Sequence, residues 1–300
     1  MPESSLEKML SVLEFVEERG QVGSMDEMLE GLALTRSTLY RYVRALTDFG
    51  LLATSPGTGY TIGPRVIELD YKIRARDPLI LASHPLMTQL VHTVSGIALL
   101  CRRYRDKVLC VHQVRGPVGF VSTYERGRVR PLLKGAASRV ILANMPTAQI
   151  AKLHQADPEG FAEAHLGESL KAVRSTLRAI RQQGWESSEG QVVAGVTGIA
   201  APIFDEGDHV MGSLSLTVGR TGMSEDELRD IAERVVFCAQ VVSSTLSIQD
   251  GAGLWPDVAE SGPASGAIGD VASPKADGSQ AEIGVAAIKP DMLRRGNRAG

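Results

Sequence analysis

The sequence predicts an α+β fold in four parts: a small domain at 4–63, a linker helix at 64–78, a larger domain at 79–248 and a disordered tail at 249–300. Three observations predict this organisation. Apolar residues recur at helical spacing in the first part. Strand-forming runs alternate with helical patterns in the third part. Residues 251–300 contain 27 Gly, Ala, Pro or Ser out of 50, and their apolar residues are too sparse to form a core.

The composition limits the class of protein. A chain of 300 residues with 43% hydrophobic content can bury more than one core. The net charge of −3 argues against general polyanion binding, so any contact with DNA must be local. Three widely spaced cysteines without a C-x-x-C motif favour neither a disulfide framework nor a zinc site, and they fit a reducing cytoplasm. We expect no signal peptide, and no apolar run approaches the ~20 residues that cross a membrane.

The first domain begins with a supporting helix at about 6–18 and continues with two closely spaced helices. Ser24 and Glu27 have the spacing of a capping box, and Gly31 ends the short helix that they begin. A second helix opens at Thr35 and runs to Phe49. A connection of about three residues between two helices is the helix-turn-helix spacing.

The second helix has two different faces. Its apolar residues fall within a narrow arc and its polar residues lie opposite, at 100° per residue. The packing arc is Leu39, Val43 and Leu46, and the outward set is Ser37, Tyr40, Arg41 and Arg44. Residues 33–47 contain three arginines and no acid, whereas residues 1–76 carry 9 Lys and Arg against 11 Asp and Glu. On an isolated helix such a face is usually only solvated, but the segment that follows favours DNA binding.

That segment predicts a β-hairpin. Residues 51–53 and 60–62 are strand-like, and a glycine-rich turn separates them. A phosphate-binding glycine loop is disfavoured, because the spacing is G-x-G-x-x-x-G and a strand follows it. Helix-turn-helix and hairpin together predict a winged helix-turn-helix that binds double-stranded DNA. The expected contact residues are Thr35, Arg36, Ser37, Thr38, Tyr40, Arg41, Arg44, Thr58 and Tyr60.

The larger domain predicts a mixed, mostly antiparallel sheet with helices on its faces. Its helices are expected at 79–93, 136–143, 147–154, 168–182 and from Ser224 to about 248. Its strands are expected at 97–104, 108–114, 118–123, 185–191, 198–204 and 210–218. This is the architecture of a sensor domain.

At this point the chain resembles the IclR family of bacterial transcriptional regulators over residues 4–248. The matching segments are Ser5-Leu6-Glu7-Lys8, Arg36-Ser37-Thr38-Leu39-Tyr40-Arg41, Gly50-Leu51-Leu52, Tyr60-Thr61-Ile62-Gly63-Pro64, Gly195-Val196-Thr197-Gly198-Ile199-Ala200-Ala201-Pro202 and Ser213-Leu214-Ser215-Leu216. The resemblance implies a winged helix-turn-helix, a linker helix and an effector domain similar to GAF and PAS folds. It also implies a homodimer or homotetramer on a palindromic operator, often of a nearby catabolic operon, and a small organic or aromatic acid as effector.

The resemblance further implies where the effector binds. By position the pocket falls on Ser122, Thr123, Gly135, Ala136, Ala137, Ser138, Gly198, Ser215 and Thr217. Free N–H groups at a helix N-terminus, with hydroxyl groups beside them, suit a carboxylate. Many members begin this helix with His-Ala-(Thr/Ser), whereas this chain has Leu133-Lys134-Gly135, so we expect a different and larger ligand. Lys134 and Arg139 are candidate cations for the acid, with surface exposure as the alternative.

Two other functions remain open. An enzyme would fit in a domain of this size, but the sequence lacks a G-x-S-x-G or H-E-x-x-H motif. The six histidines stand apart without metal-ligand spacing: His84, His92, His112, His154, His165 and His209. We therefore expect no catalytic residue, metal or cofactor. The second alternative keeps DNA binding and reduces the larger domain to an oligomerisation module.

Overall fold

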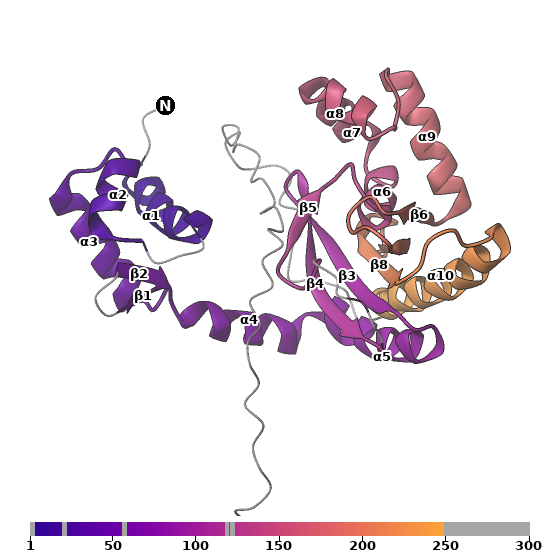
Figure 1. Ribbon diagram of the computed structural model, residues 1–300, viewed down its shortest axis with the longest axis horizontal. Coiled ribbons are helices and arrows are strands. Elements are labelled where there is room, and N and C mark those ends of the chain that lie inside the picture. The colour runs from indigo at the N-terminus through magenta and orange to yellow at the C-terminus, as the bar shows by residue number, and fades with distance from the viewer. Residues whose placement is uncertain (1–3, 20–22, 56–58, 118–119, 121–123, 249–300) are drawn as a thin grey trace, which may run out of the picture. The chain divides into compact units, whose positions relative to one another are not determined.

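The computed structural model describes residues 4–19, 23–55, 59–117, 120 and 124–248 (Figure 1). Several predictions from sequence fall outside these residues. They are the strand at 118–123, the site residues Thr58, Ser122 and Thr123, and the tail at 249–300.

The N-terminal helices α1 (Ser5–Arg19), α2 (Met25–Gly31) and α3 (Arg36–Asp48) pack around one small core. The predicted capping box is present, since the Ser24 hydroxyl accepts from the Glu27 N–H and the Glu27 carboxylate accepts from the Ser24 N–H. Leu39, Val43 and Leu46 of α3 are buried, as the helical arc predicts. The complete core is Val12, Val16, Met28, Leu39, Tyr42, Val43, Leu46 and Leu52.

A hairpin of β1 (Leu52–Ser55) and β2 (Gly59–Ile62) follows α3 directly, as predicted. Two glycines hold it against the end of α3. Gly50 has φ +73°, which favours glycine, and a Cβ on Gly63 would collide with the carbonyl oxygen of Gly50. The Gly50 carbonyl also accepts a hydrogen bond of 3.0 Å from the N–H of Arg65. The hairpin, the end of α3 and the start of the next helix are therefore packed backbone to backbone.

Two consecutive helices, α4 (Arg65–Arg76) and α5 (Pro78–Thr93), meet at Asp77. The Asp77 carboxylate caps α5 by accepting from the Leu79 N–H at 2.9 Å. The same oxygen lies 3.3 Å from Nη2 of Arg102, and the two side chains are 1% and 6% exposed. Burial lowers the pKa of Arg102, and the charge of Asp77 opposes that shift.

The larger domain contains one six-stranded sheet in the order β5-β4-β3-β8-β7-β6. Its strands are β3 (Ile97–Tyr104), β4 (Lys107–Arg115), β5 (Val129–Pro131), β6 (Glu186–Glu189), β7 (Thr197–Phe204) and β8 (Val210–Val218). The expectation of a mixed sheet is wrong, because every neighbouring pair in the described sheet is antiparallel. At the centre of the sheet, β3 from the earlier part of the domain pairs antiparallel with β8 from its later part. The strand expected at 185–191 is shorter than predicted, and β5 was not predicted.

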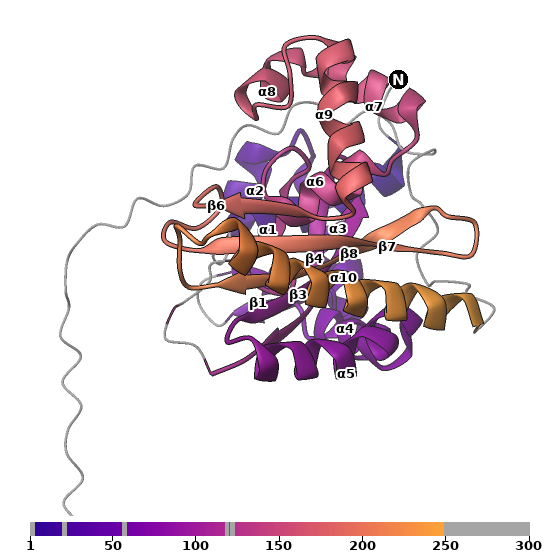
Figure 2. The same cartoon turned by 90° about the vertical axis from the view of Figure 1, so that its right-hand side faces the viewer.

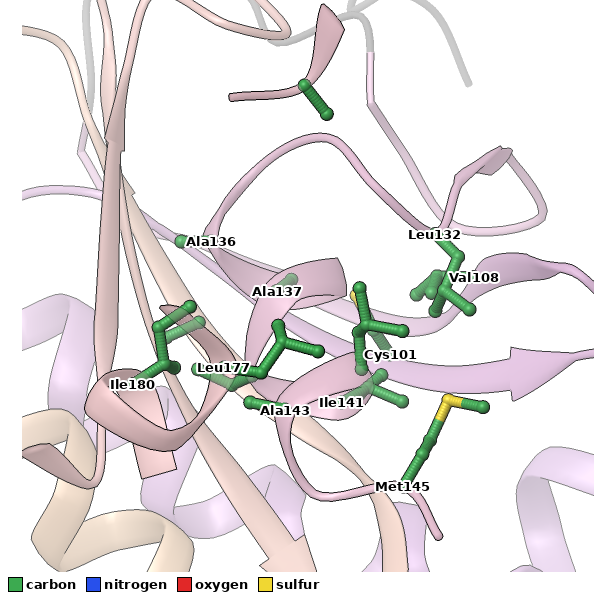
Figure 3. Packing of buried hydrophobic residues seen from close by; sticks show 14 of the residues in the cluster. Cys101, Val108, Leu132, Ala136, Ala137, Ile141, Ala143, Met145, Leu177 and Ile180 are labelled. Carbon is green, nitrogen blue, oxygen red and sulfur yellow. The ribbon is translucent and has the colours of Figure 1, made fainter. Parts of the chain in front are cut away.

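Helices cover both faces of this sheet, as predicted. One face packs on α5 and α10 (Glu225–Ile248), which Figure 2 shows lying side by side along the sheet. The other face packs on α6 (Ala136–Ala143), and α9 (Leu170–Gln183) packs against α6. Figure 3 shows Ala137 and Ile141 of α6 beside Leu177 of α9 and Cys101 of β3. Helices α7 (Thr147–Ala156) and α8 (Pro158–Glu163) complete this layer, and α8 was not predicted. No helix in the described ranges is long and apolar enough to cross a membrane.

The buried pair Asp77–Arg102 yields a stability prediction. We expect Asp77→Ala to lower the free energy of unfolding by about 3–5 kcal/mol, because it leaves the Arg102 charge buried without its partner and removes the α5 cap. Denaturant unfolding followed by the fluorescence of Trp185, which packs against this core, measures the change. Asp106→Ala, in an exposed turn, is the control. The double variant Asp77→Ala, Arg102→Met should recover part of the loss, and a single-variant loss below about 1 kcal/mol would contradict the assignment.

Candidate functional site

The outward face of α3 is polar, cationic and exposed. Arg36, Ser37, Tyr40, Arg41 and Arg44 are all exposed, and Tyr40 retains 54% of its accessible surface. The helical arc places Ser37, Tyr40, Arg41 and Arg44 opposite the core, and Arg36 joins them in the structure. A helix with this face fits the major groove, where Arg can read guanine or pair with phosphate.

Two of the three arginines already have acidic neighbours. Arg36 lies 2.8 Å from Asp26 and Arg44 lies 3.8 Å from Asp48, and all four side chains are largely exposed. Exposed ion pairs of this kind are weak and screened by salt, so they leave both cations available. Arg41 has no described carboxylate within ion-pair distance, and its guanidinium lies 5.4 Å from the ring centroid of Tyr42.

Other predicted contact residues also have local structural roles. The Thr35 hydroxyl caps α3 by accepting from the Thr38 N–H at 3.3 Å. Tyr60 is half-buried and packs against the N-terminal core. Tyr42, which the predicted packing arc omits, is buried, and its hydroxyl lies 2.7 Å from that of Ser5.

A small pocket lies on the α6 face of the sheet, in the larger domain. It is formed by the first residues of α6, one end of β3, β7 and β8, and the segment that follows β6. The lining residues are Leu99, Tyr124, Arg130, Ala136, Ala137, Ser188, Gly190, Gln191, Val192, Val193, Val196, Gly198, Ser215 and Thr217. The cavity measures about 30 Å³, which is room for about one water molecule.

The structure brings five of the sequence-predicted pocket residues together. Ala136, Ala137, Gly198, Ser215 and Thr217 line the cavity. Strand register explains the last three, because Gly198 pairs with Thr217 and Ser215 pairs with both Ala200 and Leu99. Gly135 caps α6 just outside the lining. Ser138 is fully buried and does not line the cavity.

The polar groups at the start of α6 are already occupied. The Gly135 N–H donates to the Gln191 side-chain oxygen at 3.2 Å, and the Ala136 N–H donates to the Ser188 hydroxyl at 3.0 Å. Ser215 lines the cavity beside these groups and is only 3% exposed.

The cation of the pocket is Arg130, which the sequence analysis missed. Its guanidinium carbon lies 3.2 Å from the ring centroid of Tyr124. Burial raises the pKa of Tyr124, so its phenol stays protonated. The two expected cations lie elsewhere: Lys134 is exposed, and Arg139 donates to the carbonyl oxygens of Leu133 and Ala164. No group of metal-ligating side chains occurs within the described ranges.

An N-terminal winged helix-turn-helix with a cationic recognition face, followed by an α+β domain with a polar pocket, defines a DNA-binding transcriptional regulator. Residues 5–56 match the family model for the IclR helix-turn-helix domain. Residues 73–244 match the model for the bacterial transcriptional regulator IclR C-terminal domain. The chain therefore belongs to the IclR family, which is a family of regulators and not of enzymes.

Individual proteins similar to this chain are also regulators. The chain is 21% identical to the HTH-type transcriptional regulator KdgR of Escherichia coli, over 82% of this chain and 94% of KdgR. It is 25% identical to the Pca regulon regulatory protein of Pseudomonas putida, over 75% and 78% of the two chains. The crystal structure of an IclR transcriptional regulator from Alicyclobacillus acidocaldarius matches with a TM-score of 0.67 and 18% identity, over 82% of this chain and 99% of the other. That structure shares the fold.

The exposed guanidinium of Arg41 yields a prediction about DNA binding. We expect Arg41→Ala to weaken specific operator binding by about 1–3 kcal/mol, the range for one lost base contact. Folding should be unaffected, because the side chain lies outside the core. A gel-shift titration at fixed salt measures the affinity, with Arg174→Ala on the exposed face of α9 as the charge-matched control. Equal losses for the two variants would mean that Arg41 acts only through net charge.

Proposed function

We propose that this protein is a ligand-responsive regulator that binds a palindromic operator and senses a small organic or aromatic acid, controlling a catabolic operon from the cytoplasm. The guanidinium of Arg130 carries the proposal, because it lines the cavity and its Nε is buried without a hydrogen-bond partner. Buried polar groups are normally hydrogen-bonded, so an unpartnered cationic group at a cavity beside a helix N-terminus favours an anionic ligand. The name of one relative, the Pca regulon regulatory protein, is consistent with control of a regulon.

We propose the outward face of α3 as the DNA-reading surface, with Thr35, Arg36, Ser37, Thr38, Tyr40, Arg41 and Arg44 as its contacts. The N-terminal turn of α3 adds unpaired N–H groups that suit phosphate. One recognition helix reads few base pairs, so a two-fold dimer on two half-sites is required for a specific operator.

Exposed apolar side chains support a second copy as the partner. Ile67 and Tyr71 of α4 are 71% and 65% exposed, and they lie one turn apart on the helix. Leu6 and Leu10 form a similar exposed pair on α1. Monomeric surfaces seldom expose such apolar patches, so we propose that α4 lies in a dimer interface.

The interface proposal predicts a change in oligomeric state. Ile67→Asp should shift the protein toward a monomer in light scattering, because it places a charge in the proposed contact. Operator affinity should fall with it. Lys72→Asp adds the same carboxylate to the same helix and should leave the dimer intact. A dimer of unchanged mass for Ile67→Asp would place the interface elsewhere.

The alternative function makes the larger domain a pure oligomerisation module, and Gly198 tests it. A Cβ on Gly198 would meet only ordinary contacts, the nearest being the Ser188 hydroxyl at 3.4 Å. Gly198→Val therefore adds volume toward the pocket without backbone strain, on a strand that favours β-branched residues. We expect it to abolish binding of small carboxylates in calorimetry while operator affinity is retained.

Ser175→Val on the exposed face of α9 is the control for added volume. If wild-type protein binds none of a broad panel of organic and aromatic acids, the oligomerisation alternative is favoured.

A further inference from the structure

Two neutral side chains occupy the N–H groups at the start of α6, where the proposed effector would bind. Gln191, from the segment that follows β6, and Ser188, within β6, supply neutral oxygen atoms to the N–H groups of Gly135 and Ala136. These are the first groups of α6, where a helix favours negative charge. A site that favours an anion is thus occupied by two uncharged side chains.

The positively charged side chain of Arg130 also lies at the start of α6. Arg130 lines the pocket. Within the described residues, it forms no ion pair with a carboxylate. Its Nε is buried without a hydrogen-bond partner. A Cβ on Gly135 would lie 2.9 Å from its Nη1, so the absence of a side chain at 135 leaves the guanidinium beside the start of α6. Arg130 therefore lies close to Gly135 at the start of α6.

The cavity is too small for an organic acid, so part of its lining must move when one binds. A volume of about 30 Å³ holds about one water molecule and no organic acid. Among the lining residues, 190–193 lie in no helix or strand, and Gln191 reaches α6 through its side-chain hydrogen bond to Gly135. A ligand therefore enters by displacing this segment.

We propose that the effector is a carboxylate that pairs with Arg130 and takes the place of the Gln191 side-chain oxygen at the Gly135 N–H. Gln191 then acts as an internal competitor that keeps the empty pocket closed. The hydroxyls of Ser215 and Thr217 orient the rest of the ligand, and Leu99 and Val196 contact its apolar body. This inference rests on the proposed effector site and specifies its chemistry.

The proposal predicts effects of opposite sign at two residues that line one pocket. Arg130→Gln should weaken carboxylate binding by about tenfold or more, the range for a lost charge-assisted hydrogen bond. Gln191→Ala should tighten it by about three- to tenfold, because the ligand no longer competes with the closed state. If Gln191 instead held the ligand, its removal would weaken binding.

The experiment is calorimetric titration of the full chain with acetate, pyruvate and benzoate, each compared with its neutral amide. The wild type should prefer the acids, Arg130→Gln should lose that preference, and Arg130→Lys should keep part of it. Arg128→Gln, an exposed arginine two residues away, and Gln182→Ala on α9 are the matched controls. Thermal unfolding verifies that each variant is folded.

The outcomes separate this inference from the effector proposal beneath it. If the wild type binds acids and amides equally well, or if Gln191→Ala weakens binding, the roles of Arg130 and Gln191 are wrong although a ligand site exists. If the wild type binds neither acids nor amides, the effector site itself fails.

Discussion

The central strands β3 and β8 must be buried on both faces, and this constraint organises the larger domain. Their alternate residues pack in opposite directions: Ala98 and Leu100 face α5 and α10, while Ile97 and Leu99 face α6. On β8 the two faces differ in chemistry. Leu214 and Leu216 enter the α10 side, whereas Ser213, Ser215 and Thr217 lie on the α6 side. Ser213 fastens α6 by donating to the Ala137 carbonyl at 3.0 Å. Small hydroxyl residues next to the start of that helix leave the pocket where a packed core would otherwise continue.

Local signals in the sequence explain which parts of the fold could be predicted. Helix caps and a periodic apolar face predicted the position of α3, and a run of strand-forming residues predicted β8. Segments of three to six residues such as β5 and α8 are too short to show a period. The same limit explains why Arg130 was missed, since it lies on β5 and reaches α6 only through long-range strand pairing. The position of Gln191, in an irregular segment after β6, likewise has no local signature.

The two candidate sites use charge in different ways. Arginines on α3 are exposed, so solvent screens their pairs with Asp26 and Asp48 and a polyanion can displace them. Arg130 lies partly buried against Tyr124, where a charge is costly unless an anion accompanies it. DNA binding through α3 should therefore depend strongly on salt, whereas ligand binding in the pocket should depend on it little. The ion pair of Asp77 and Arg102 is buried more deeply than either of these. Asp77 also caps α5, so the pair holds the start of that helix in place.

The contact between Gly50 and Gly63 has a mechanical consequence. Because these backbones approach closely and the Arg65 N–H donates to the Gly50 carbonyl, direct backbone contacts join the end of α3, the strands of the hairpin and the first turn of α4. A rotation of α4 about its axis would therefore rotate α3, the proposed DNA-reading helix, with it. A side chain at residue 63 would loosen that coupling while leaving every proposed DNA-contacting residue in place.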